Sequence, residues 1–219
     1  MEVKINLENR QPERTRAIFR LTQLFVAGLF KLFIGLKIEG AENVPRSGAF
    51  YLASNHQSWF DPPIVGSTCP RELFFAAKLE LFKTPVLGFL VKYYNSLPVR
   101  RDGFDRALLK SAGEVIKAGY GLILFPEGTR YLDGNLHTPR AGIGMLASKY
   151  HAPIVPVYVS GSSAIGRKLS FRGVKIIYGK PFNIEDLNLG SVSGKDLYQK
   201  ISLGVMQKIA EVGGVKPPE

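Results

Sequence analysis

Apolar and polar residues follow two different periods along the chain, and the two periods alternate. Short apolar runs with the length of buried strands occur at residues 48–54, 73–77, 96–99, 121–125, 154–159 and 174–178. Apolar residues recur at helical spacing over residues 79–94, 104–118, 141–150 and 195–211, and a further helix opens at Pro62. Strands that alternate with helices predict an α/β fold, here a single domain with a mixed, largely parallel sheet flanked by helices.

Residues 1–36 carry a different pattern. Ile18, Leu21 and Phe25 belong to an apolar series that recurs every three or four positions, which predicts an amphipathic helix. Arg20 and Lys31 interrupt the series, so its uncharged run is shorter than the ~20 apolar residues that a spanning helix needs. We expect this helix to lie in the plane of a membrane interface; packing against its own domain is the alternative. The chain then divides into a membrane-associating helical segment (1–36), a main domain (37–212) and a tail (213–219).

Composition and charge narrow the class of partner. The chain is 45% hydrophobic, which suffices for a sizeable core, yet 29 Lys and Arg against 18 Asp and Glu give it a net charge of +11. Such a chain indicates an anionic partner, and nucleic acid, a membrane surface and a phosphorylated small molecule all fit. The single cysteine, Cys69, excludes a disulfide framework. His137 and His151 lack neighbours at metal-ligand spacing, so no metal site is expected.

The first group of residues with candidate chemistry spans 55–61 and directly follows a predicted strand. It contains His56 and Asp61, and Asp61 precedes Pro62, which biases it away from helical geometry. We therefore expect His56 in a loop, with Asp61 turned back towards it from the start of the next helix. A carboxylate on one imidazole nitrogen fixes the tautomer and makes the other nitrogen a stronger general base. The alternative is that Asp61 only caps the helix.

The second group is Phe-Pro-Glu-Gly-Thr-Arg at 125–130, which also follows a predicted strand. Arg130 would bind a phosphate through two parallel hydrogen bonds, helped by the backbone amides of Gly128 and Thr129. Glu127 would either accept hydrogen bonds from substrate hydroxyls or hold Arg130 in place. The alternative is a tight turn that carries an internal Glu–Arg pair.

Together, the His-x4-Asp block and the Phe-Pro-Glu-Gly-Thr-Arg block resemble the glycerolipid acyltransferase family, most closely its 1-acylglycerol-3-phosphate acyltransferase branch. Two weaker blocks, at 97–101 and 153–157, resemble the family's other motifs in order and spacing, so the resemblance covers about residues 36–185. In the first of them the resemblance assigns a phosphate contact to Arg101, with Arg100 as the alternative. Lys78 and Arg140 match further basic positions of the family and are expected to contact substrate.

The resemblance implies a function for the domain at 37–212. A fatty acyl group would pass from an acyl thioester to the sn-2 hydroxyl of lysophosphatidic acid to give phosphatidic acid, with His56 as general base oriented by Asp61. The donor would be acyl-CoA or an acyl carrier protein thioester, both co-substrates, and no cofactor is expected.

The expected surroundings are a phospholipid membrane, at the cytoplasmic face of the cell membrane, with the protein peripheral or monotopic. Basic side chains outside the site would face anionic lipid or the acidic acyl carrier. An acyltransferase for another acceptor (glycerol 3-phosphate, another lysophospholipid or an amino-acid lipid) stays open. A non-catalytic basic module for membrane or nucleic acid is a further alternative. No nucleic acid is expected as partner, because no nucleic-acid-binding motif is evident.

Overall fold

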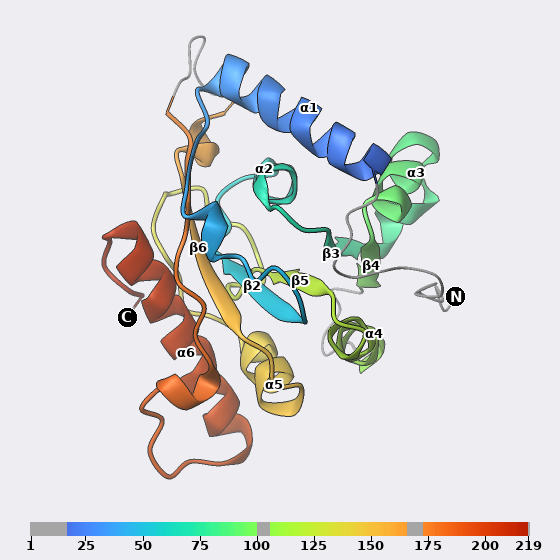
Figure 1. Ribbon diagram of the computed structural model, residues 1–219. Coiled ribbons are helices and arrows are strands. Elements are labelled where there is room, and N and C mark those ends of the chain that lie inside the picture. Colours follow the sequence, from blue (N-terminus) through green and yellow to red (C-terminus); the bar gives the residue numbers. More distant parts are fainter. Residues whose placement is uncertain (1–16, 100–105, 166–172, 219) are drawn as a thin grey trace.

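The sheet at the centre of the molecule is mixed and largely parallel. A computed structural model describes residues 17–99, 106–165 and 173–218 (Figure 1). Within them one seven-stranded sheet has the order β1-β7-β6-β2-β5-β3-β4. Its strands are β1 (Lys37–Glu39), β2 (Phe50–Ser54), β3 (Leu73–Lys78), β4 (Ser96–Val99), β5 (Gly121–Leu124), β6 (Ile154–Ser160) and β7 (Lys175–Tyr178). Neighbours are parallel except β6 and β7, which are antiparallel, so the predicted sheet is confirmed.

Two apolar cores lie on opposite faces of this sheet. Successive side chains of a strand point to opposite faces, so Tyr51 and Ala53 of β2 enter one core while Phe50 and Leu52 enter the other. Helices α4 (Arg106–Lys117), α5 (Gly142–Lys149) and α6 (Gly194–Gly213) cover the first face. Helices α1 (Ala17–Ile34) and α2 (Asp61–Thr68) cover the second, as Figure 1 shows.

Helix α1 exposes the apolar series that defines it in the sequence. Ile18, Leu21 and Phe25 are 69%, 66% and 67% exposed, whereas Phe19, Gln23 and Ala27 are buried. The amide nitrogen of Gln23 donates to the carbonyl oxygen of Gly66 at 2.7 Å and to that of Cys69 at 3.3 Å. The docked face of α1 is therefore narrow and centred on a polar side chain, and its apolar stripe points away from the domain.

By length and composition alone, α1 is apolar enough to cross a membrane: its 18 residues have a mean hydropathy of 1.7, and 22% of them are buried. This differs from the sequence-based expectation, which counted only the uncharged run between Arg20 and Lys31. The mean hydropathy of the whole helix stays high despite these two charged residues. Its contacts with α2 nevertheless hold it along the surface of the domain (Figure 1).

One local expectation was wrong, and one strand was not foreseen. The single helix expected at 79–94 is a 3₁₀ helix, η2 (Leu79–Lys83), followed by α3 (Pro85–Tyr93). Pro85 disfavours helical geometry at the preceding residue, and Thr84 is extended with φ −85° and ψ 141°. Strand β1 was not expected, because three residues are too few to show an alternating pattern; it forms by pairing with β7.

Candidate active site

The sheet brings the sequence blocks with candidate chemistry to one edge. Strands β2, β5, β3 and β4 are consecutive neighbours and parallel, so their carboxyl ends share an edge. The block at 55–61 follows β2 and the block at 125–130 follows β5, while Lys78 ends β3 in register with Val99 of β4. Arg100 and Arg101, the expected phosphate ligands after β4, lie outside the described residues.

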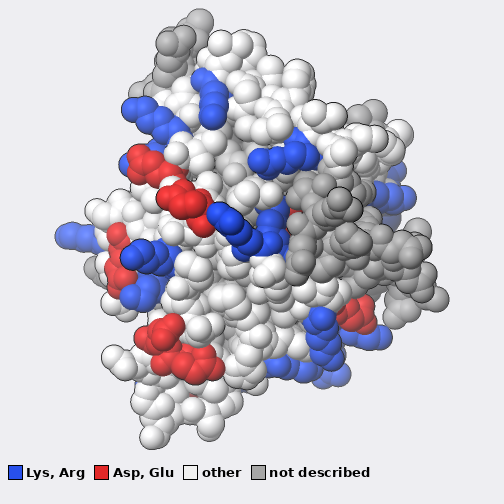
Figure 2. Space-filling model, in the orientation of Figure 1, with Lys and Arg blue, Asp and Glu red and all other residues white. Residues whose placement is uncertain are grey.

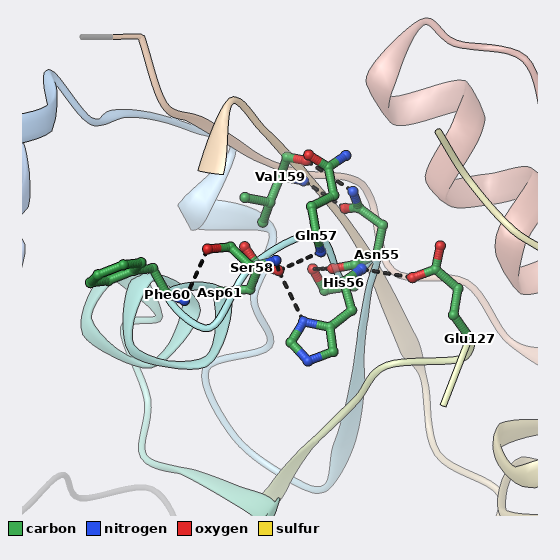
Figure 3. Close-up of polar contacts among 9 residues, drawn as sticks. Asn55, His56, Gln57, Ser58, Phe60, Asp61, Glu127 and Val159 are labelled. Carbon is green, nitrogen blue, oxygen red and sulfur yellow. Dashed lines mark hydrogen bonds and ion pairs between the residues drawn. The ribbon is translucent and has the colours of Figure 1, made fainter. Parts of the chain in front are cut away.

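His56 and Asp61 are paired at this edge (Figure 3). Nδ1 of His56 lies 2.9 Å from Oδ2 of Asp61. The Asp61 side chain is fully buried, whereas that of His56 keeps 13% of its surface exposed. The same carboxylate oxygen accepts the backbone N–H groups of Gln57 at 2.6 Å and Ser58 at 2.7 Å, so it acts as an acceptor throughout and Nδ1 carries the proton. The second ring nitrogen, Nε2, then offers its lone pair and points away from Asp61 in Figure 3.

Asp61 does not cap α2. It is the first residue of that helix, Phe60 takes the N-cap position, and no side chain caps the helix end. The Asp61 carboxylate instead turns back over the preceding loop, which is the arrangement expected from the proline that follows it. The alternative of a capping aspartate is therefore wrong.

Three further contacts fix the loop that carries His56. The side chain of Asn55 bonds both the N–H and the carbonyl oxygen of Val159 in β6, at 2.8 and 2.9 Å. The backbone N–H of Tyr131 donates to the carbonyl oxygen of His56 at 3.0 Å. The imidazole stacks on Phe125, with ring centroids 4.1 Å apart. Sequence reasoning assigned these three partners no role, because each comes from another strand or loop.

Glu127 contacts the protein's own backbone. Its Oε2 accepts the N–H of His56 at 2.7 Å (Figure 3), and its Oε1 accepts the N–H of His137 at 3.1 Å. Its side chain is buried, and burial raises its pKa to about 7 although these two hydrogen bonds act in the opposite direction. The carboxylate therefore joins the His56 loop to the loop at 131–140. A contact with substrate hydroxyls stays a prediction.

The rest of the second block forms a turn. The N–H of Gly128 donates to the carbonyl oxygen of Phe125 at 3.0 Å, and Gly128 has a left-handed φ of 67°. A Cβ on Gly128 would lie 2.6 Å from Cδ of Arg140, so the glycine lets that side chain approach the turn. Thr129 and Arg130 are half-buried, and the Arg130 guanidinium lies over the ring of Trp59, 3.1 Å from its centroid. The structure thus brings Arg130 and Arg140 to the turn after β5.

A second histidine–carboxylate pair lies on the loop after this turn. Nε2 of His137 is 2.9 Å from Oδ2 of Asp133, and the His137 ring stacks on Tyr131 at 3.6 Å between centroids. The four-residue spacing of Asp133 and His137 was the available signal, and sequence reasoning missed it. Among the described residues, no three His, Cys, Asp or Glu side chains are grouped closely enough to hold a metal ion.

The model of the family named Acyltransferase matches residues 35–160, which include the blocks around His56 and Glu127. The chain belongs to the acyltransferase family. A 1-acyl-sn-glycerol-3-phosphate acyltransferase of Bacillus subtilis is 28% identical over 195 residues, which cover 86% of this chain and 95% of that protein.

A lyso-ornithine lipid O-acyltransferase of Pseudomonas aeruginosa is 30% identical over 142 residues, covering 64% of this chain and 54% of that protein. The crystal structure of the 1-acyl-sn-glycerophosphate acyltransferase PlsC of Thermotoga maritima is similar, with a TM-score of 0.72 and 28% identity. It matches 91% of this chain and 81% of its own. The α/β fold is thus shared with a solved acyltransferase.

As an acyltransferase, the chain has a site that can accept a proton at Nε2 of His56. Asp61 holds the imidazole in one tautomer and can balance the charge of the protonated ring. The neighbouring turn supplies the Thr129 amide and the Arg130 guanidinium, which suit an anionic group.

Proposed function

We propose that this acyltransferase moves a fatty acyl group from an acyl thioester to the sn-2 hydroxyl of lysophosphatidic acid, giving phosphatidic acid. The observation that carries the proposal is the pair formed by His56 and Asp61 at 2.9 Å, at the carboxyl edge of the sheet. The proposed acceptor is supported by the relative in Bacillus subtilis, which is named 1-acyl-sn-glycerol-3-phosphate acyltransferase and aligns over most of both chains.

In the proposed reaction, Nε2 of His56 takes the proton of the acceptor hydroxyl while Asp61 stabilises the imidazolium. The acceptor oxygen bonds to the thioester carbonyl carbon, and the carbon–sulfur bond then breaks. The proton passes from His56 to the departing thiolate, so the base is regenerated without a covalent intermediate on the enzyme. No cofactor takes part, because the thioester is already activated.

We assign the acceptor's phosphate to the basic side chains at the same edge. Arg130, with the amide of Thr129, would bind the phosphate after β5, and Arg101, or else Arg100, would do so after β4. The Gly128 amide, expected from the sequence to help, instead donates to the carbonyl oxygen of Phe125 within the turn. Lys78 and Arg140 would complete this positive surface. Such contacts hold the hydroxyl near His56, which contributes through proximity.

We further propose that catalysis takes place at a membrane, on its cytoplasmic face, with acyl-CoA or an acyl carrier protein thioester as donor. Two observations support the proposed membrane contact: the exposed apolar stripe of α1, and the exposed Trp59 on the loop that carries His56. These residues would enter the interface while the sheet stays outside it.

A direct test compares the wild type with His56→Ala and Asp61→Asn, using lysophosphatidic acid and a labelled acyl thioester. We expect kcat to fall by about 10²- to 10⁴-fold in both, because one lacks the base and the other loses the acceptor that fixes its tautomer. The matched control is His151→Ala, since His151 also lies beside a carboxylate, Glu185 at 3.4 Å, but is exposed.

Robust transfer by His56→Ala would overturn the proposed base. The choice of acceptor is tested by a screen at fixed donor, and here the Pseudomonas relative favours a second candidate, a lyso-ornithine lipid. Transfer to that lipid in preference to lysophosphatidic acid would replace the acceptor while keeping the mechanism. A wild type that transfers to no lipid acceptor would revive the non-catalytic binding module.

A further inference from the structure

A groove of about 330 Å³ lies between α4 and α5, on the face of the sheet opposite α1. Its floor is apolar and consists of Leu109, Met145, Leu146 and Tyr150. The floor is held firmly, because the hydroxyl oxygen of Tyr51 lies 3.0 Å from the carbonyl oxygens of both Leu146 and Tyr150. Gly113 lets the Tyr150 ring lie against α4, since a Cβ there would come within 2.3 Å of that ring.

Four cations surround this floor. Arg106, Lys110 and Lys149 line the groove, and the ammonium groups of Lys117 and Lys149 lie 5.5 and 5.3 Å from the centre of the Tyr150 ring. Helices α4 and α5 contain one carboxylate, Glu114, and no ion pair within the described part of the chain involves any of the four cations. Figure 2 shows Lys and Arg side chains gathered over α4 and α5, at the lower right. Over the described residues, four cations against the one carboxylate of α4 and α5 leave an excess of positive charge around an apolar floor.

The placement of the groove favours a soluble occupant. Figure 1 shows α1 and α4–α5 on opposite sides of the sheet, so a membrane that contacts the apolar stripe of α1 leaves the groove facing away from the lipid. Helix α4 contacts β4 and β5, two of the strands whose carboxyl ends form the active-site edge. It is ~18 Å long, at 1.5 Å per residue. An occupant of the groove would thus lie beside the strands that carry the active-site loops and outside the membrane.

The lining of the groove is that of a protein interface. Small-molecule sites orient their ligand with precisely placed polar groups among apolar walls, whereas the polar groups here are long, exposed side chains around the rim. An apolar centre with a charged rim is the usual anatomy of a protein–protein contact. A row of cations along a helix is complementary to an acidic helix that presents an apolar side chain between its carboxylates.

We propose that the α4–α5 groove is the docking surface for an acidic acyl carrier protein, which delivers its acyl thioester to His56. This rests on the proposed function in requiring a thioester donor, but not on the identity of the acceptor. Docking at Arg106, Lys110, Lys117 and Lys149 would hold the carrier on the side of the sheet away from the lipid, while its flexible prosthetic arm enters from the carboxyl edge.

Direct binding tests the surface without catalysis. Acyl carrier protein bearing its phosphopantetheine arm is titrated against the wild type, against Lys110→Glu/Lys149→Glu and against Lys37→Glu/Lys180→Glu. The last pair changes the net charge equally, at exposed positions outside α4 and α5. We expect the α4–α5 variant to bind about 10-fold or more weakly, and the control to bind within about twofold of the wild type. Binding by the wild type should also weaken steeply with salt. Circular dichroism checks folding, and Lys110→Ala/Lys149→Ala, which only removes charge, should show a smaller loss in the same direction.

The donor comparison gives a second readout. The ratio of kcat/KM for the carrier thioester to kcat/KM for the CoA thioester should fall in Lys110→Glu/Lys149→Glu and stay constant in the control. Equal losses with both donors, or displacement of the carrier protein by free CoA, would overturn the assignment in favour of a small-molecule site. A wild type that does not bind the carrier, or a reversal variant that binds it as well as the wild type does, would overturn it outright.

Vesicle binding that depends on Lys110 and Lys149 would also overturn the assignment, by making the groove a membrane contact. Failure of the proposed function gives a different pattern: carrier binding that depends on these lysines, but no transfer to lysophosphatidic acid. That result keeps the docking surface and replaces the acceptor.

Discussion

A single carboxylate oxygen organises the loop that carries the candidate base. Oδ2 of Asp61 lies within 2.9 Å of three donors, namely Nδ1 of His56 and the backbone N–H groups of Gln57 and Ser58. Three donors on one buried oxygen leave the loop few alternative conformations, and each such charge-assisted bond is stronger than a neutral one. The five-residue separation of His56 and Asp61 is therefore the length of a loop in which the Asp61 carboxylate folds back to bond His56, Gln57 and Ser58.

Glu127 holds the same loop from the turn that follows β5. We expect Glu127→Gln to lower kcat by about 10- to 100-fold with little change in KM, because the amide nitrogen cannot accept an N–H and His56 shifts.

Burial raises the Glu127 pKa to about 7 from an ordinary 4.5, so this group lowers the stability of the folded state as the pH rises between those values. Gln does not titrate, so the melting temperature of the variant minus that of the wild type should increase from about pH 5 to about pH 8.

The control for this experiment is Glu42→Gln, an exposed carboxylate on the 3₁₀ helix η1 (Ala41–Asn43). It should leave kcat unchanged. Its melting temperature minus that of the wild type should stay constant from about pH 5 to about pH 8. A Glu127→Gln enzyme with unchanged kcat, or with a difference in melting temperature that is flat with pH, would contradict the role given to Glu127.

At the scale of elements, α1 depends on one polar anchor. We expect Gln23→Ala to loosen α1 from α2 by about 1–3 kcal/mol, because the carbonyl groups of Gly66 and Cys69 lose the donor that they share. Hydrogen–deuterium exchange over α1 should then become faster, while exchange in the strands stays slow.

The matched control is the neighbouring Thr22→Ala. The Thr22 hydroxyl bonds the carbonyl of Phe19 within the same helix, so its removal leaves the contact with α2 intact. Equal exchange in the two variants would show that α1 is held by its apolar contacts alone.

At the scale of the molecule, the two sides of the sheet present different surfaces. We expect the double substitution Phe25→Asp/Leu32→Asp to weaken binding to phospholipid vesicles by about 10-fold or more, since each exposed apolar side chain gains about 1.5–3 kcal/mol when buried. Co-sedimentation with vesicles measures the effect. Leu203→Asp, at an exposed apolar position of α6 on the opposite side of the sheet, should bind as the wild type does. A comparable loss in Leu203→Asp would place the membrane contact elsewhere.

Much of the fold follows from local sequence. The alternation of short apolar runs with helical spacing predicts an α/β sheet, and six of the seven strands fall on those runs. Pro62 after Asp61 sets the backbone that lets the carboxylate turn back to His56. These are properties of neighbouring residues, so the sequence alone determines them.

The tertiary structure decided what depends on contacts between distant segments. Glu127 lies 71 residues from His56, and only the adjacency of β2 and β5 brings its carboxylate to the His56 backbone. The same holds for the face of α1 that docks and for the groove between α4 and α5. Periodicity shows that a helix has an apolar stripe, but whether this stripe meets protein or faces outward depends on the neighbouring elements. The sequence thus determined the elements and the candidate residues, and strand order and packing decided which of them meet.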